Sequence, residues 1–257
     1  MYKPFLGYKP ILKNKWELEI LRKANAIVME ILLYLKEEVK PGKNTFEFEE
    51  LALYLCNKKR VKPAFKGYKG YPFALCVSVN EVIVHGMPKK DKILKEGDIV
   101  SFDFGVIYED YVGDAALTVG VGKISEQAEK LLKVTEEALY KGIEKAHFGN
   151  RIGDISYAIQ KHVESNGFNV IREFVGHGVG KKLHEPPEIP NFGKPGKGPK
   201  IEIGMVLAIE PMVSAGSWEV EILDDGWTAV TKDRSLAAHF EHSIAVTPKG
   251  PEILSII

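Results

Sequence analysis

Four acidic residues lie inside or beside apolar runs that are typical of buried strands. Asp103 stands between two phenylalanines, and Glu210 follows directly after an apolar run. An ionised carboxylate is costly to bury unless it is paired or binds a cation. A single acid of this kind is more often exposed on a half-buried strand, but four without a nearby lysine or arginine favour a shared cation site. The four are Asp103, Asp114, Glu210 and Glu241.

An imidazole in a glycine-rich run completes this set. His177 lies among three glycines between positions 176 and 180, where little side-chain bulk covers the ring. A lone histidine is more often a hydrogen-bonded core residue, but beside four acids it is better interpreted as a ligand. Four carboxylates and one imidazole suit Mn, Fe(II), Co or Zn, and two ions bridged by carboxylates. Two such cations can share a hydroxide and polarise a carbonyl, which is the chemistry of amide hydrolysis.

The elements that must position these residues occur in the same order twice. Each half has two segments with helical spacing, followed by short apolar runs typical of strands. Residues 16–39, 44–59, 125–146 and 153–165 are predicted helices, the first two with capping-box spacing at their starts. The predicted strands are residues 73–79, 82–85, 98–104, 115–121, 168–174, 205–209, 229–231 and 242–247.

The two halves also align at a common offset. Asp103 and Glu210 are 107 positions apart (210 − 103), and so are Gly97 and Gly204 (204 − 97). Each pair belongs to a glycine turn, a buried strand and a carboxylate at the end of the strand. A chance match between two ordinary α+β units is the alternative, because glycine and acidic residues are common. We favour a pseudo-twofold fold in which each half delivers a carboxylate to one centre.

The amino-acid composition indicates which binding partners and which cellular compartment to expect for the protein. The 257 residues contain 35 basic and 35 acidic side chains, so no overall charge favours nucleic acid or a membrane surface. Cys56 and Cys76 form no CxxC pair, which argues against a disulfide framework or a thiolate zinc site. There is no signal-peptide core, and the apolar stretch 27–35 is too short to span a bilayer. We therefore expect a cytoplasmic protein.

Seven segments together resemble the type I methionine aminopeptidases, which are pita-bread metallopeptidases. The resemblance runs from the first helix to the end of the chain, and its specificity comes from the order and spacing of the segments. It implies an α+β fold with two pseudo-twofold halves, a mostly antiparallel curved sheet and helices on the outer face. We expect one catalytic domain over residues 1–257, with halves at about 14–121 and 125–257 and a short arm at 1–13. The segments are residues 80–88, 97–103, 113–114, 176–180, 184–187, 209–212 and 240–242.

The resemblance implies two divalent metal ions per chain, from among Co, Mn, Fe and Zn. Asp103 would chelate one ion, and Asp114 and Glu241 would bridge both. His177 and Glu210 would complete the shell of the other ion. Glu210 would also be the general base that takes a proton from the bridging water.

Two further histidines gain catalytic roles from the same resemblance. His85 would contact the substrate and pass a proton toward the leaving amine, and His184 would stabilise the charge that develops on the scissile carbonyl oxygen. For either residue the alternative is a loop histidine without function. No role beyond packing is assigned to the other histidines. His147 and His162 are expected to be solvated, and His239 and His242 are expected to point to the face opposite Glu241.

A pocket for the methionine side chain is implied as well. Aromatic rings and a cysteine thiol suit an unbranched thioether, although Phe65 and Leu183 could equally be ordinary core residues. Two positions, Phe65 and Leu183, depart from the bacterial pattern, which has cysteine and phenylalanine there. The expected pocket residues are Phe65, Tyr68, Tyr71, Cys76, Leu183 and Trp227.

The resemblance thus implies a monomeric enzyme that removes the N-terminal methionine from nascent polypeptides and prefers a small second residue. Direct contact with the ribosome is left open. One alternative is an X-Pro peptidase of the same fold, which the short segment before residue 14, Trp227 and the segment 68–76 disfavour. The other is a binding module without activity, which the five filled ligand positions and the absence of a basic tail disfavour.

Overall fold

The computed structural model describes residues 9–256, so most of the predicted arm at 1–13 lies outside the described residues. The predicted helices are confirmed. Asn14 and Asn44 cap the first two through capping boxes with Glu17 and Glu47, and Ser125 caps the third. The helices are α1 (Lys15–Glu37), α2 (Thr45–Lys59), α3 (Glu126–Ile143) and α4 (Ile152–Ser165), with a 3-10 turn, η1, at Tyr68–Gly70.

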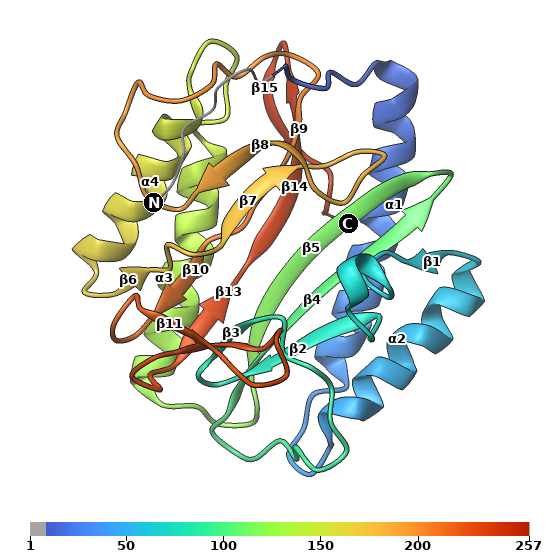
Figure 1. The fold of residues 1–257 in the computed structure, drawn as a ribbon, viewed down its shortest axis with the longest axis vertical. Coiled ribbons are helices and arrows are strands. Elements are labelled where there is room, and N and C mark those ends of the chain that lie inside the picture. Colours follow the sequence, from blue (N-terminus) through green and yellow to red (C-terminus); the bar gives the residue numbers. More distant parts are fainter. Residues whose placement is uncertain (1–8, 257) are drawn as a thin grey trace.

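One nine-stranded sheet runs through both halves, and all of its pairings are antiparallel. The halves meet where β5 pairs with β14, with Glu241 opposite Ala116. Figure 1 shows the long β4–β5 hairpin crossing the molecule beside β14 and β9. The path is β1 (Lys62–Pro63), β4 (Ile99–Tyr108), β5 (Tyr111–Gly120), β14 (Glu241–Thr247), β9 (Val206–Ile209), β7 (Val175–Gly178) and β8 (Glu185–Pro190), with β2 (Leu75–Val79) on β4 and β15 (Gly250–Ile253) on β14.

Two small three-stranded sheets flank the large one. In the first, β10 (Met212–Ser214) pairs with β13 (Ala237–His239) and with β6 (Asn169–Val170). In the second, β12 (Ala229–Thr231) pairs with β11 (Val220–Ile222) and with β3 (Val82–Val84). These short strands bring the segments around positions 85, 174 and 227 to one side of the large sheet.

The helices pack on the outer face of the curved sheet, as the resemblance implies. α1 contacts β4 and β5, while α3 contacts β5, β9 and β14. The largest apolar cluster fills the layer between these helices and the strands, and its members are fully or nearly fully buried. Within residues 9–256, no helix is long and apolar enough to cross a membrane. The opposite, concave face of the sheet is left for the site.

Two predicted strand boundaries are corrected by pairing. The strands expected at 98–104 and 115–121 form a longer hairpin, closed by Glu109 and Asp110 in left-handed conformations with φ of 46° and 64°. The strand expected at 168–174 is only the short β6, and β7 forms instead within the glycine run. Glycine has low strand propensity, so this strand depends on its neighbours β8 and β9 and gives little signal in the sequence.

Candidate metal centre

Sheet register places three of the predicted ligands on one face. Asp103 of β4 and Glu241 of β14 both lie opposite Ala116, and Asp114 precedes Ala116 by two residues on β5. Directly paired residues, and residues two apart on a strand, face the same side of a sheet. The small side chain of Ala116 therefore leaves open the space toward which the three carboxylates point.

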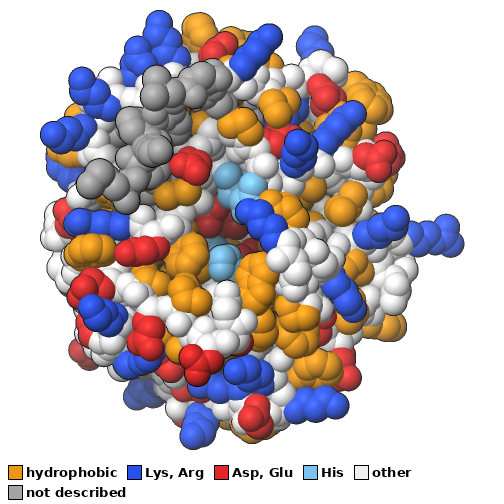
Figure 2. All heavy atoms as spheres, in the orientation of Figure 1, with side chains coloured by type: hydrophobic (Ala, Val, Ile, Leu, Met, Phe, Trp, Pro, Cys, Tyr) orange, Lys and Arg blue, Asp and Glu red, His pale blue; other side chains and the backbone are white. Residues whose placement is uncertain are grey.

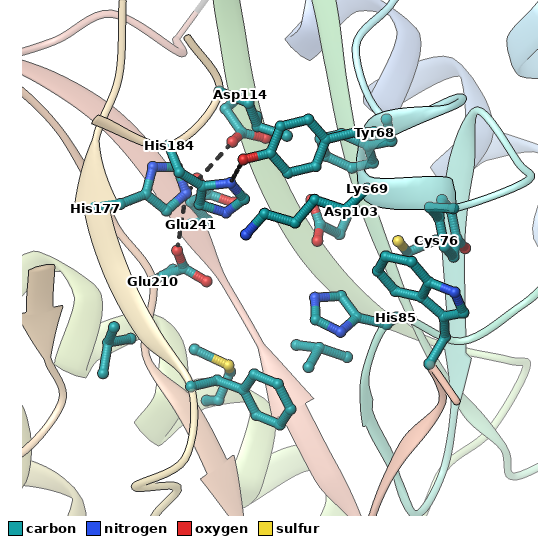
Figure 3. Close-up of a pocket in the computed structure, with 18 of the residues that line it drawn as sticks. Tyr68, Lys69, Cys76, His85, Asp103, Asp114, His177, His184, Glu210 and Glu241 are labelled. Atoms are coloured by element: carbon teal, nitrogen blue, oxygen red, sulfur yellow. Dashed lines mark hydrogen bonds and ion pairs between the residues drawn. The ribbon is translucent and has the colours of Figure 1, made fainter. Parts of the chain in front are cut away.

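The second half supplies the other two ligands. His177 lies on β7 opposite Ala208 of β9, and Glu210 follows the end of β9. His177 Nε2 lies 3.4 Å from Glu210 Oε1 and 3.7 Å from Asp114 Oδ2. Figure 3 shows the five side chains converging from both halves. The structure thus brings together all five residues that the sequence singled out.

Three buried oxygens of this cluster lack hydrogen-bond donors within residues 9–256. Asp103 Oδ1, Asp114 Oδ1 and Glu241 Oε1 are buried and have no hydrogen-bond partner within the described residues. Glu49, a buried acid elsewhere, shows the contrast, because the backbone amides of Ala74 and Leu75 donate to its carboxylate at 2.9–3.0 Å. Buried oxygens without donors are what a divalent cation requires of its ligands. The donor set therefore fits a metal centre.

Burial shifts every ionisable ligand toward its neutral form. Burial raises the pKa of Asp103 to about 7, despite an opposing effect of His239. Burial also raises the pKa values of Asp114, Glu210 and Glu241 well above their usual range. Burial lowers the pKa of His177 to about 4, so its imidazole is neutral, as a metal ligand must be. The His177 Nδ1 atom lies 2.9 Å from the carbonyl oxygen of Gly178, and an Nδ1–H that donates there leaves Nε2 free to bind a cation.

These shifts predict how pH affects the metal-free protein. Between about pH 6.5 and pH 8 the histidines are neutral in both the folded and the unfolded chain, so the carboxylates decide the balance. The folded chain then binds more protons than the unfolded chain, because burial raises the pKa of Asp103 to about 7 and those of Asp114, Glu210 and Glu241 well above their usual range. The free energy of unfolding of the chelated protein should therefore fall as pH rises through this window. Bound cations keep the carboxylates ionised and remove this loss. Thermal unfolding of chelated and Mn-loaded protein between pH 6.5 and pH 8 checks this, and parallel profiles for the two would contradict it.

A pocket of about 290 Å³ opens beside the cluster. Figure 2 shows histidine and acidic side chains gathered in a hollow with apolar side chains around it. The pocket is lined by all five ligands and by both predicted catalytic histidines, and also by Lys69, Glu173 and Phe174, to which the sequence gave no role. All six residues expected to hold the methionine side chain also line it, namely Phe65, Tyr68, Tyr71, Cys76, Leu183 and Trp227.

The apolar part of the pocket is neutral. Cys76 pairs in register with Asp103, and burial raises the pKa of its thiol, so it stays protonated. The hydroxyl of Tyr71 lies 3.2 Å from the carbonyl oxygens of Leu75 and Gly86, to which it donates. The ring of Trp227 meets that of Tyr71 edge-on at 5.2 Å. This wall therefore presents rings and a thiol to a ligand, and no charge.

The two predicted catalytic histidines flank the cluster. His184 Nδ1 lies 2.8 Å from the hydroxyl oxygen of Tyr68, and the His184 and His177 ring centroids are 4.2 Å apart. His85 has a left-handed backbone (φ 58°) and lies edge-on to the ring of Phe174 at 5.3 Å. Burial lowers the pKa of His85 to about 4 and that of His184 to about 3. Both imidazoles are thus neutral at pH 7.

The prediction for His239 is wrong. Its Nε2 lies 3.5 Å from Glu210 Oε2, and together with Glu210 and Glu241 it forms a second group of possible ligands. His239 is the last residue of β13 and Glu241 the first of β14, and a ligand atom of each lies within 4.8 Å of one from Glu210. His242, one residue after Glu241, does point to the other side, where its Nδ1 lies 2.9 Å from the hydroxyl of Ser255.

His239 is expected to position the Glu210 carboxylate. Replacing it with alanine should lower kcat about 10- to 100-fold with little change in KM, because Glu210 loses a neighbour that orients it. His239→Gln should retain most of the activity, since an amide N–H can take the place of Nε2–H. His242→Ala is the matched control on the other side of the sheet. Steady-state kinetics of the three variants check this, and equal losses for alanine and glutamine at position 239 would contradict it.

Comparison with known proteins adds independent information. Residues 19–248 match the model of Metallopeptidase family M24. A methionine aminopeptidase of Clostridium perfringens is 55% identical over 96% of this chain and 99% of that protein. The methionine aminopeptidase 1 of Bacillus subtilis is 51% identical over 95% of this chain and 98% of that protein.

Solved structures agree with these similarities. A methionine aminopeptidase of Thermotoga maritima superposes with a TM-score of 0.95 at 52% identity, and the match covers 97% of this chain and 100% of that one. A prolidase of Pyrococcus horikoshii superposes with a TM-score of 0.78 at 23% identity, and the match covers 64% of that longer chain. The likeness to the prolidase is one of fold alone.

Proposed function

Because the chain belongs to metallopeptidase family M24 and, within that family, to the methionine aminopeptidases, we propose that it removes the N-terminal methionine from peptides and nascent proteins with two divalent cations. The observation that supports this most directly is the buried group of four carboxylates and a neutral imidazole beside an apolar pocket. Three of the carboxylates have an oxygen without a hydrogen-bond donor within residues 9–256. Such a site holds cations next to the place where a substrate side chain is recognised.

Each ligand has a proposed place around the two cations. Asp103 would bind one ion, His177 and Glu210 the other, and Asp114 and Glu241 would bridge them. When bound, the ions, from among Co, Mn, Fe and Zn, would lower the pKa of a water between them and polarise the scissile carbonyl. Side chains of the protein are proposed to carry out the proton transfers and to stabilise the charge on the carbonyl oxygen.

Glu210 is the proposed general base. Its carboxylate faces His177 and His239 at 3.4 and 3.5 Å, so it is held between two neutral imidazoles. Burial raises its pKa, which makes the carboxylate a better proton acceptor than an exposed glutamate. We infer that it takes a proton from the attacking water and holds it for the leaving amine.

His184 is the proposed donor to the scissile carbonyl oxygen. If the hydroxyl of Tyr68 donates to Nδ1, the neutral ring carries its proton on Nε2. An Nε2–H aimed into the pocket stabilises negative charge that develops on the carbonyl oxygen. His85, across the pocket, is also neutral. It relays a proton to the leaving amine by accepting at one nitrogen and donating from the other.

The pocket wall supports selection of methionine. A space of about 290 Å³ lined by Tyr71, Cys76 and Trp227 accepts an unbranched side chain, and sulfur packs favourably against aromatic ring edges. A charged or hydroxyl-bearing side chain would lose its hydrogen bonds to water against this wall. We therefore propose selectivity for methionine at the first position and for a small residue at the second.

We also propose that the protein acts as a monomer, because the pocket lining within one chain already includes the five proposed ligands, both proposed catalytic histidines and the apolar wall. We also propose that the protein acts in the cytoplasm, because nascent polypeptides are its proposed substrates. Transient contact with the ribosome is a further part of the proposal. These points are tested separately from the chemistry, by light scattering and by cosedimentation of the protein with ribosomes.

The experiment that tests the proposed function is a metal-titrated peptide assay. Protein stripped with a chelator is reloaded with Co, Mn, Fe or Zn and offered Met-Ala-Ser and Ala-Pro peptides. We expect release of methionine from the first, no cleavage of the second, and maximal activity at two ions per chain by elemental analysis. Cleavage of Ala-Pro alone would favour an X-Pro peptidase. Failure with every metal would favour a binding module.

A further inference from the structure

A lysine at the pocket has no part in the chemistry described above. Lys69 lines the pocket, and Figure 3 shows its side chain reaching across the opening toward His184. Its Nζ lies 5.4 Å from the ring centroid of Tyr68. Among residues 9–256, no carboxylate oxygen lies within the 4.0 Å of Nζ that would define an ion pair. The amine is therefore available to a ligand.

The backbone holds this lysine in an unusual conformation. Lys69 is the central residue of η1 and has φ of 48°, in the left-handed region that glycine and asparagine adopt more readily. Gly67 and Gly70 flank the turn, and its ends are joined by hydrogen bonds from Gly67 N to Tyr71 O at 2.7 Å and from Tyr71 N to Tyr68 O at 2.9 Å. Residues in such conformations cluster at ligand-binding sites. The turn fixes the direction of the Lys69 side chain. A surface lysine that serves only solubility needs no fixed direction.

The other charged side chain that lines the pocket outside the ligand cluster forms no ion pair with Lys69 within residues 9–256. Glu173 also lines the pocket, and its carboxylate accepts a hydrogen bond from the backbone amide of Arg172 at 3.3 Å. The charge of Lys69 reaches the reaction centre, since it contributes to the lowered pKa values of both His85 and His184. A peptide whose methionine fills the apolar wall must pass this amine as it leaves the pocket.

We propose that Lys69 is a specificity-determining residue that favours peptides with a carboxylate a short distance after the cleaved bond. The carboxylate comes from an acidic side chain at the third or fourth position, or from the free C-terminus of a short peptide. The inference rests on the proposed function and adds a substrate class to it. Because the amine is exposed, the preference is modest, about two- to fivefold in kcat/KM, and it weakens as salt is added.

The test compares matched peptides on the metal-loaded protein. Met-Ala-Ser-Asp-amide, Met-Ala-Ser-Ser-amide and Met-Ala-Ser-Lys-amide vary only the charge at position four, and Met-Ala-Ser with a free or amidated C-terminus separates the two sources of the carboxylate. We expect the wild type to prefer the acidic peptides, Lys69→Gln to show no preference, and Lys69→Glu to prefer the lysine peptide. Lys66→Gln, an exposed lysine of the same segment that does not line the pocket, is the control and should behave as wild type.

Two outcomes would overturn the proposal. One is a ratio of acidic to neutral kcat/KM that is the same in wild type and Lys69→Gln. The other is an equal loss on all peptides in Lys69→Gln with an unchanged unfolding temperature, since Lys69 would then act on the peptide backbone or on His184. Cleavage of the neutral serine peptide by wild type reports on the proposed function separately, so failure of one conclusion is distinguished from failure of the other.

Discussion

Replacing Asp103 with asparagine, or Glu210 with glutamine, is expected to lower kcat by at least about a hundredfold while the protein remains folded. Both changes keep the size of the side chain but remove a negative charge from the cluster that is proposed to hold the cations. Asp103→Asn should also reduce the number of bound ions. Glu210→Gln should lose the proton acceptor as well as a ligand. Elemental analysis and steady-state kinetics of the two variants measure both effects.

The metal-free form of Asp103→Asn provides an internal check. In wild type the buried Asp103 has its pKa raised to about 7, so above that pH the chelated protein must carry a buried charge. The asparagine variant carries no charge at position 103. After chelation it should therefore be more stable than chelated wild type at pH 8, although it is much less active.

Asp110→Asn is the matched control for this series. Asp110 lies in the turn of the same β4–β5 hairpin, is exposed, and has φ of 64°, which asparagine tolerates well. Its activity and metal content should equal those of wild type. Near-normal turnover in Asp103→Asn or Glu210→Gln after chelation and reloading would show that the proposed ligand assignment is wrong.

Replacing His184 with alanine is expected to lower kcat about 10²- to 10³-fold, which is the typical cost of losing one donor to an oxyanion. The number of bound ions should stay at the wild-type value, because His184 is not a proposed ligand. Tyr68→Phe should give a smaller loss in the same direction, since it removes only the hydroxyl that contacts Nδ1. The kinetics of both variants, measured beside their metal content, check this.

His162→Ala controls for the loss of a histidine as such. His162 lies on α4, away from the pocket, with Nε2 3.0 Å from Glu137 Oε2, and its removal should leave kcat unchanged. Loss of bound ions in His184→Ala would move His184 into the metal shell. An unchanged kcat would remove it from the catalytic machinery and leave it as a loop histidine.

Much of the site was predictable from local sequence because burying charge is costly. Four acids in or beside apolar strands, without a nearby basic partner, favoured a shared cation site and singled out Asp103, Asp114, Glu210 and Glu241, with His177 as their companion. The offset of 107 between Asp103 and Glu210 indicated two halves, and the capping boxes at Asn14 and Asn44 were predicted and confirmed. These features depend on neighbours in the chain, so local sequence reveals them.

The remaining features depend on partners far apart in the chain. β7 exists because β8 and β9 pair with it, although its glycines give little strand signal. His239 reaches Glu210 across small strands whose arrangement no local pattern specifies. Lysine does not favour the left-handed conformation that Lys69 adopts, so the identity of the residue does not predict the turn. The Lys69 charge can act on a ligand only because the fold places this residue at the pocket.

The sequence by itself therefore singled out the side chains proposed as metal ligands, because the chemical types and their apolar surroundings are local properties. The tertiary structure decided how they meet, through the register that sets both Asp103 and Glu241 opposite Ala116. The tertiary structure also decided what surrounds these side chains, namely the uncharged wall of the pocket and the amine of Lys69. Such relations join residues more than a hundred positions apart, and only packing of the complete sheet fixes them.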